Sequence, residues 1–383
     1  MTRTPPPPHG QAPLRTVQVL GHGAAAGAAH VRSLTAGLIA RGVQVTVCAP
    51  PTAEETHGFT AAGARFVPVA ARPAPGALAA LRGAFRDADV VHAHGVRAGL
   101  SALPVLRTVR GPRGGRLPLV VTWHTAARAT GALVRLRERQ LARAAAVVLG
   151  VCAGLVDRAR ERGARDARLA PVAPPGPRTG GDGGETDRTR HKVRAELGAV
   201  ERPLVLAAGP LEERQEHDLL LDAAHAWAAR EPRPLLVVVG EGSRRAALQR
   251  RIDAEELPVL LAGHRADLPE LLAAADVVAV PGRWEARPPL AQQALAAGAP
   301  LVAAATGELR ELLGPAAELT RPGDAVSLAR AVLGLLADPA RRTALATAGP
   351  LQAADWPTED ATVAQVLSVY DEVARPGRSH VPA

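Results

Sequence analysis

Aromatic residues and cysteines are scarce in this chain, and each scarcity excludes a class of protein. Aromatic residues make up 2% of the 383 positions. Proteins that bind single-stranded nucleic acid interleave basic residues with aromatic side chains on which bases stack, so we do not expect nucleic acid as a partner. The two cysteines, Cys48 and Cys152, lie in apolar, strand-like segments. This placement favours buried thiols over a disulfide or a metal pair, and it fits a reducing cytoplasm.

The chain also lacks a long hydrophobic run. No window approaches the roughly 20 uninterrupted apolar residues that a membrane-spanning helix needs. The first segment, MTRTPPPPHGQAP, is rich in proline, and no apolar stretch follows Arg3 before the first strand begins. We therefore predict a disordered tail over residues 1–13 rather than a signal peptide. These features predict a cytoplasmic protein with at most peripheral membrane contact.

Lysine is nearly absent, and Lys192 is the only one in the chain. The formal charge of +9 therefore comes from arginine. A positive field of this kind favours an anionic ligand or an anionic membrane surface. A length of 383 residues with 47% hydrophobic content exceeds one ordinary core and indicates about two domains.

Strand and helix patterns alternate in the first half of the chain, as in a doubly wound α/β domain. A Val-rich strand at residues 16–20 leads into the small-residue loop 21–27 and a helix at 28–40. A loop of this kind brings backbone N–H groups close to a phosphate or carboxylate at a helix N-terminus. We interpret Gly23 and Gly27 as candidate ligand-contacting positions, with tight packing alone as the alternative.

Three histidines, His92, His94 and His124, fall at or near the ends of two predicted strands, 89–93 and 117–122. The carboxyl ends of parallel strands meet at one edge of a sheet, and open α/β sheets bind ligands there. A single histidine at such a place is commonly structural. The convergence of three histidines on one edge favours a functional site.

The second half repeats the α/β pattern after a break. Residues 174–187 are mostly Pro, Gly, Asp, Thr and Arg without apolar periodicity, which predicts a linker or surface loop. We place the first Rossmann-like domain at 14–176, the linker at 177–200 and a second Rossmann-like domain at 201–354. A final helix is predicted within residues 355–376.

The densest stretch of the chain is ADVVAVPGRWEARPPLAQQALAAGAPLVAAATGELREL, residues 275–312. It predicts a buried strand at 277–280, a helix that begins at Pro288-Pro289, and a second strand at 301–304. Glu285 then follows the carboxyl end of a parallel strand. A surface ion pair with Arg283 and Arg287 is the alternative explanation of this carboxylate.

This stretch resembles the nucleotide-sugar signature of the retaining family-four glycosyltransferases, which have the GT-B fold. In that signature a Glu, seven residues and a second Glu contact the sugar and the ribose. Glu285 matches the first Glu, and Gln293 stands at the second position. The segment 122–125, TWHT, is similar to the family's T-aromatic-H-x segment, whose histidine, matched by His124, contacts the transferred sugar or helps organise the site.

The resemblance implies an α/β fold of two Rossmann-like, doubly wound domains that face each other across a cleft. The C-terminal helix would cross back and pack on the first domain. It also implies that the first domain binds the acceptor through Gly23, Gly27 and His94.

The family's diphosphate-binding loop reads G-R-L-x-x-(E/Q)-K-G, and GPLEERQE at 209–216 is similar to it in length. Pro210 stands at the Arg position, Gln215 at the Lys position and Glu216 at the Gly position. The resemblance, with the nearby arginines as substitutes for the missing cations, gives the candidate donor-binding set Gly209, Arg214, Gln215, Glu241, Gly242, Arg283, Gln293 and Gly307.

The resemblance therefore predicts transfer of a sugar from a nucleoside-diphosphate sugar with retained configuration, with Glu285 and His124 as catalytic residues. The nucleotide sugar is a substrate, and neither a cofactor nor a metal ion is expected. The acceptor stays open between a lipid-linked and a small molecule. Two alternatives remain: a degenerate, non-catalytic GT-B protein that binds a partner or nucleotide, and a sugar-nucleotide epimerase.

Overall fold

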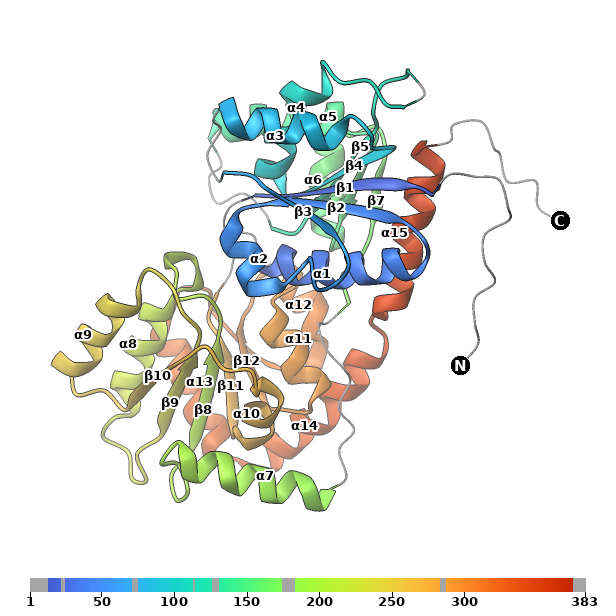
Figure 1. Cartoon of the computed structure of the whole chain (residues 1–383). Helices are drawn as coiled ribbons and strands as arrows, with labels where there is room; N and C mark the ends of the chain where they lie inside the picture. Colours follow the sequence, from blue (N-terminus) through green and yellow to red (C-terminus); the bar gives the residue numbers. More distant parts are fainter. Residues whose placement is uncertain are drawn as a thin grey trace. The chain divides into compact units, whose positions relative to one another are not determined.

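The structure, a computed structural model, describes residues 13–21, 25–70, 75–112, 114–125, 131–173, 183–282 and 287–374. The chain divides into two compact units (Figure 1). The first unit comprises Met1–Val172 and Pro357–Ala383, and the second comprises Ala173–Trp356. Residues 1–12 of the predicted tail lie outside the described part.

The first unit is built on one parallel sheet with the strand order β3-β2-β1-β4-β5-β6-β7. Its strands are short and Val-rich, and most are buried, as expected for a sheet covered on both faces. They are β1 (Arg15–Leu20), β2 (Gln44–Ala49), β3 (Arg65–Pro68), β4 (Val90–His94), β5 (Leu119–Trp123), β6 (Val147–Gly150) and β7 (Ala167–Leu169).

Helices cover both faces of this sheet; in Figure 1, α1 lies on one side of it and α3, α4 and α5 on the other. The helices are α1 (Ala25–Ala40), α2 (Pro51–His57), α3 (Pro75–Phe85), α4 (Val96–Leu106), α5 (Ala132–Ala144), α6 (Ala153–Glu161) and α15 (Glu359–Ala374). The strand order reverses between β1 and β4, and at such a switch point the loops leave the sheet in opposite directions and open a crevice.

Helix α15 returns to the first unit and packs beside α1, as the family resemblance implied (Figure 1). Val363, Val366 and Val369 are 2–3% exposed and join the core formed by β1, β2 and α1. Tyr370 is completely buried in the same core. The last helix of the chain therefore belongs to the fold of its first unit.

The second unit has a parallel sheet with the order β10-β9-β8-β11-β12-β13, and its switch point lies between β8 and β11. The strands are β8 (Leu204–Ala208), β9 (Leu235–Val239), β10 (Val259–Gly263), β11 (Val277–Val280), β12 (Leu301–Ala304) and β13 (Glu318–Thr320). The helical elements are α7 (Gly183–Glu196), η1 (Glu213–Gln215), α8 (His217–Trp227), α9 (Arg245–Ala254), α10 (Leu268–Ala274), α11 (Pro289–Ala296), α12 (Gly307–Leu313), η2 (Gly314–Ala316), α13 (Ala325–Ala337) and α14 (Pro339–Ala354).

Alternate residues of strand β8 pack into two separate hydrophobic cores in the second unit. Leu204 and Leu206 pack with α10, α11 and α12, whereas Val205 and Ala207 pack with α8, α9 and α13. All four residues are at most 2% exposed. Continuous apolar sequence in this strand is thus explained by burial of both faces of the sheet.

The predicted linker at 177–200 is wrong for its central part, because residues 183–196 form helix α7. The helix is polar and carries no apolar stripe, so no helical periodicity marks it in the sequence. Tertiary contacts hold it instead. Arg190 and Arg194 each bind a carboxylate oxygen of Asp276 at 3.0 Å, and Val193 is buried in the core.

Candidate functional site

Four histidine rings gather in the first unit, beside the switch point of its sheet. His92 and His94 lie on β4, His124 directly follows β5, and His30 projects from α1. The ring centroids of His92 and His94 are 4.2 Å apart, and those of His94 and His124 are 5.7 Å apart. His30 lies 5.7 Å from His94 and 5.6 Å from His124. The predicted convergence of three histidines is therefore real, and His30 is a fourth member.

A chain of hydrogen bonds connects these rings to the C-terminal helix through Gln18 of β1. Gln18 Nε2 donates to Tyr370 OH at 2.9 Å, and Gln18 Oε1 lies 2.9 Å from His94 Nε2. His94 Nδ1 lies 3.4 Å from His124 Nε2. On the other side, Tyr370 OH lies 2.6 Å from His92 Nδ1. The network thus spans β1, β4, the β5 end and α15.

The network has a definite direction with this placement of the Gln18 amide. Because Gln18 Oε1 is an acceptor, His94 Nε2 must carry its proton, and His94 Nδ1 then accepts from His124 Nε2–H. Tyr370 accepts from Gln18, so its hydroxyl donates to His92 Nδ1. His124 is thereby fixed in the Nε2–H form, and its Nδ1 lone pair has no hydrogen-bond partner among the described residues.

Burial keeps these rings uncharged. Desolvation lowers the pKa of His30 to about 4 and that of His124 to about 3. For His124, repulsion from a protonated His30 lowers the pKa further, by a smaller amount. Burial and the neighbouring histidines hold the pKa values of His92 and His94 well below the usual value. At neutral pH the network is therefore a set of neutral, directional hydrogen bonds.

His94, which we predicted to contact the acceptor, lies inside the hydrogen-bond network. It is 1% exposed, and both of its ring nitrogens are engaged, one by Gln18 and one by His124. It acts on His124 and is a positioning residue. His124, at the end of its strand, is partly exposed and is the histidine that retains an open acceptor atom.

The Gly-rich first loop is only partly described. Gly23 lies outside the described residues, whereas Gly27 is buried in the first turn of α1. The helix begins at Ala25, three residues earlier than the predicted residue 28. Gly27 is therefore a residue of the helix, and the prediction that it forms part of the loop is wrong.

The sequence did not point to three members of the network: Gln18, His30 and Tyr370. Gln18 did carry a signal, because a polar residue stands in the middle of the buried strand TVQVL. Tyr370 is the only tyrosine of the chain, and its hydroxyl meets Gln18 across 352 positions of sequence. Only the return of α15 to the first unit brings them together.

In the second unit, the candidate donor loop after β8 is held by backbone contacts. Gly209 N donates to Val239 O at 2.9 Å, and Leu211 N donates to Glu241 O at 2.9 Å. A Cβ on Gly240 would lie 2.0 Å from Gly209 O, and one on Gly242 would lie 2.5 Å from Leu211 O. Glycine is required here because the loops after β8 and β9 touch through their main chains.

Glu216 adopts φ of 56°, a left-handed conformation that favours glycine. It stands at the position where the resembled loop has Gly. His217 follows it, and its Nε2 donates to Pro210 O at 3.1 Å, which closes the loop on itself. The loop thus keeps a turn typical of glycine although the residue has changed.

The cations that the resembled loop carries are absent from their positions, which are occupied by Pro210 and by Gln215 of η1. The side chain of Arg214, and all of Arg283 and Glu285, lie outside the described part. Their predicted roles therefore stay predictions.

The remaining donor candidates lie on three different elements. Gln293 is partly buried on α11, and Gly307 is the first residue of α12, whose N-cap Thr306 accepts from Leu309 N at 3.2 Å. Glu241 pairs with Arg245 at 3.1 Å. Its carboxylate is thus used in an ion pair with the next helix.

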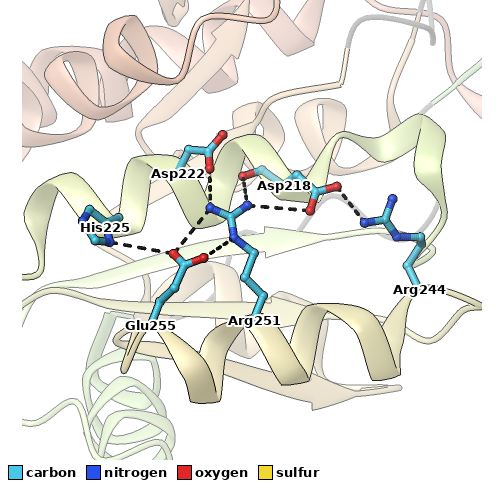
Figure 2. A network of polar contacts seen from close by, with 6 residues as sticks. All are labelled: Asp218, Asp222, His225, Arg244, Arg251 and Glu255. Atoms are coloured by element: carbon cyan, nitrogen blue, oxygen red, sulfur yellow. Dashed lines mark hydrogen bonds and ion pairs between the residues drawn. The ribbon is translucent and has the colours of Figure 1, made fainter.

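Carboxylates tie the donor loop to its neighbours. Glu212 accepts from Ser243 N at 3.0 Å and from Ser243 Oγ at 2.8 Å. Figure 2 shows Arg244, beside that serine, bound to Asp218 at the start of α8. In the same view Arg251 of α9 reaches the carboxylates of Asp218, Asp222 and Glu255, and so joins α8 to α9.

Among the described residues, no group of three or more His, Cys, Asp or Glu side chains is arranged to hold a metal ion. The same part of the chain contains no helix that is long and apolar enough to cross a membrane.

Two family models match the chain. The model described as "Glycosyl transferase 4-like domain" matches residues 26–175, and "Glycosyl transferases group 1" matches residues 189–352. All but the last three residues of the match at 26–175 lie in the first unit, and the whole match at 189–352 lies in the second unit. Each unit therefore corresponds to one of these two glycosyltransferase models.

Individual relatives agree with the family models. The chain is 33% identical to a D-inositol 3-phosphate glycosyltransferase of Salinispora tropica over 51% of this chain and 44% of the relative. It is 28% identical to an alpha-D-kanosaminyltransferase of Streptomyces kanamyceticus over 74% of this chain and 77% of the relative. The chain spans about half the length of several curated relatives that it matches.

The fold has a close structural counterpart in the crystal structure of Anabaena Alr3699/HepE in complex with UDP. The TM-score is 0.74 at 19% sequence identity, with 94% of this chain and 100% of that chain covered. This likeness confirms the predicted GT-B class of two Rossmann-like units. The chain belongs to the family-four glycosyltransferases, and the epimerase alternative is not supported.

Proposed function

We propose that the chain transfers a sugar from a nucleoside-diphosphate sugar to an acceptor with retention of anomeric configuration. The observation that carries this proposal is the hydrogen-bond network that joins His124 to His94, Gln18 and Tyr370. With His124 Nε2–H committed to His94, its Nδ1 can accept a hydrogen bond from a sugar hydroxyl. A neutral ring also places no positive charge beside a sugar that becomes cation-like as its bond to the leaving group breaks.

On the donor side we assign Glu285 to orient the sugar and Gln293 to hold the ribose. The Gln293 carbonyl is an acceptor for a ribose hydroxyl, without the charge-assisted strength of a carboxylate. The departing diphosphate would be stabilised by Arg214, Arg283 and backbone N–H groups instead of the family's Arg and Lys. The proposal requires no cofactor and no metal ion. We also propose a cytoplasmic location, which the two free thiols of Cys48 and Cys152 support.

The test is turnover of radiolabelled UDP-, GDP- and ADP-sugars with inositol phosphates and lipid-linked sugars as acceptors. The first acceptor class follows from the named activity of one relative. We expect one donor to be consumed, the product to retain the anomeric configuration by NMR, and His124→Ala to lower kcat about 100-fold. Absence of transfer and of donor hydrolysis with every donor would contradict the proposal.

A second candidate function is a non-catalytic protein that acts through a partner or a bound nucleotide. It is favoured by the donor loop, where Pro210 and Gln215 replace the cations and Glu212 is engaged by Ser243. Calorimetry with UDP, GDP and ADP, combined with the turnover assay, separates the two functions. Nucleotide binding that is lost in Arg214→Ala or Arg283→Ala, together with turnover, supports the transferase. Binding without turnover, or no heat with any nucleotide, supports the non-catalytic protein.

A further inference from the structure

Helix α5 (Ala132–Ala144) of the first unit exposes two large apolar side chains. Leu133 is 59% exposed and Leu136 is 61% exposed, and a spacing of three residues places them on one side of the helix. The residues that face the core, Glu138, Leu141 and Ala142, lie on the other side. Packing within the first unit therefore does not explain the two leucines.

The exposed surface of the helix beside these leucines is basic. Arg137, Arg139 and Arg143 flank the leucines on α5, and all three are exposed. Its single acid, Glu138, is 1% exposed and binds Arg158 and Arg162 at 2.7 and 2.9 Å. Within the described residues, neither Arg137 nor Arg139 has an ion-pair partner. The outer face of α5 thus combines apolar and positive side chains without an exposed carboxylate.

The charge extends through the surrounding sequence. Residues 75–144 contain twelve arginines but only three acids, Asp87, Asp89 and Glu138. Their formal charge is therefore +9, the same as that of the whole chain. The remaining residues contain 34 basic and 34 acidic side chains, since 46 minus 12 and 37 minus 3 both give 34. All of the net charge is concentrated in the segment that includes α5.

We propose that the exposed face of α5 docks on an anionic lipid bilayer. Leucine side chains enter the boundary between headgroups and acyl chains, while arginines extend their charged ends to the lipid phosphates. An anionic surface attracts juxtamembrane basic residues, and the attraction falls off within a Debye length. An acidic soluble protein would match the charge but leave the two leucines unexplained, and single-stranded nucleic acid would call for exposed aromatic side chains.

Vesicle co-sedimentation of the full chain tests this proposal without any requirement for sugar transfer. We expect the protein to pellet with phosphatidylcholine vesicles that contain phosphatidylglycerol, to stay in solution with phosphatidylcholine alone, and to be partly released by salt. No binding to the anionic vesicles, or equal binding to both kinds of vesicle, would overturn the proposal.

Matched variants separate insertion from simple charge attraction. We expect Leu133→Ser with Leu136→Ser, and separately Arg137→Glu with Arg139→Glu, each to weaken partitioning about tenfold or more. The controls lie in the second unit: Val326→Ser with Leu351→Ser, where the wild-type side chains are 67% and 69% exposed, and Arg250→Glu with Arg330→Glu. Because all these residues are exposed, circular dichroism should show every variant folded.

The controls also give the contrary outcomes. Loss of binding in the second-unit variants to the same degree would show a diffuse charge effect and overturn docking through α5. If the leucine variant binds vesicles normally while soluble polyglutamate or single-stranded DNA competes, the face is a polyanion site and the membrane proposal fails.

Discussion

Two ion-pair clusters, one in each unit, use the same chemical groups in different surroundings. In the first unit, Glu138 is 1% exposed and receives two arginines that are 22% and 18% exposed. In the second unit, Arg251 binds three carboxylates that are 32–48% exposed (Figure 2). Because water screens the second cluster, burial rather than the number of contacts decides what each cluster contributes.

The candidate sites differ in the same way. The first unit fixes His124 through buried, neutral side chains, so each polar atom depends on a particular partner. The second unit builds its donor loop from glycine main chain and partly exposed carboxylates. We therefore expect single polar changes to act strongly in the first unit and weakly in the second.

The largest effect is expected for Glu138→Ala. The change leaves two largely buried guanidinium groups without their carboxylate, which should cost about 3 kcal/mol of unfolding free energy. Urea unfolding measures this loss, with hydrogen exchange of peptides from the first unit as the readout. Glu161→Ala is the matched control, because Glu161 pairs with the same Arg162 at 3.6 Å but is 69% exposed. Equal losses in both variants would refute the role of burial.

Acid should destabilise the first unit through its histidines. The folded-state pKa of His30, about 4, is lower than its unfolded value of 6.5, so the unfolded chain binds the proton first. The stabilisation is complete above pH 6.5 and is lost as the pH falls toward 4, about 3 kcal/mol for this residue.

The variant His30→Leu should remove about one proton from the slope of unfolding free energy against pH in that window. A slope that is the same in wild type and His30→Leu would contradict the assignment.

Tyr370→Phe tests the network that orients His124. Without the hydroxyl, Gln18 Nε2 loses its acceptor and His92 Nδ1 loses its donor, which should cost about 1–2 kcal/mol. Nitrogen-15 NMR of the imidazoles should also show that His94 and His124 no longer hold one tautomer. Thr35→Val is the control, because the buried Thr35 hydroxyl has no hydrogen-bond partner within the part of the chain that the structure describes, and its loss should be nearly neutral. Unchanged tautomers in Tyr370→Phe would exclude a positioning role.

Glu216→Gly should stabilise the second unit by about 0.5–1 kcal/mol, because glycine adopts the left-handed conformation without strain although it gains freedom in the unfolded chain. The change also removes a carboxylate from the donor loop, so nucleoside diphosphate affinity should rise in calorimetry. Glu256→Gly, at φ of 49° outside that loop, should give the stability gain alone. Weaker nucleotide binding in Glu216→Gly would show that the carboxylate serves the ligand.

The smallest effect is expected for Arg251→Ala. Its three ion pairs are partly exposed, so the change should shift Tm by less than about 4 °C despite the number of contacts in Figure 2. Calorimetric scans at low and high salt measure it, and the difference from wild type should shrink with salt. A shift as large as that of Glu138→Ala would remove the contrast between the two clusters.

Local patterns in the sequence determined most of the architecture. The Val-rich run of β11, the Pro288-Pro289 start of α11 and the apolar strands of both sheets each follow from backbone preferences of nearby residues. The histidines at the ends of β4 and β5 were found in the same way, because a parallel sheet brings the carboxyl ends of its strands to one edge. The polar helix α7 was missed, since its stability comes from Asp276, a distant residue.

The sequence by itself determined that two doubly wound units form and that His124 lies at the carboxyl end of a strand of the first sheet, because hydrophobic periodicity and strand ends are local properties. Only the tertiary structure decided the direction of the hydrogen bond between His124 and His94. This direction depends on the contact of Gln18 with Tyr370 across 352 positions. It also depends on the burial that keeps His30, His92 and His94 uncharged. Desolvation and hydrogen-bond direction arise between distant segments, and no local pattern encodes them.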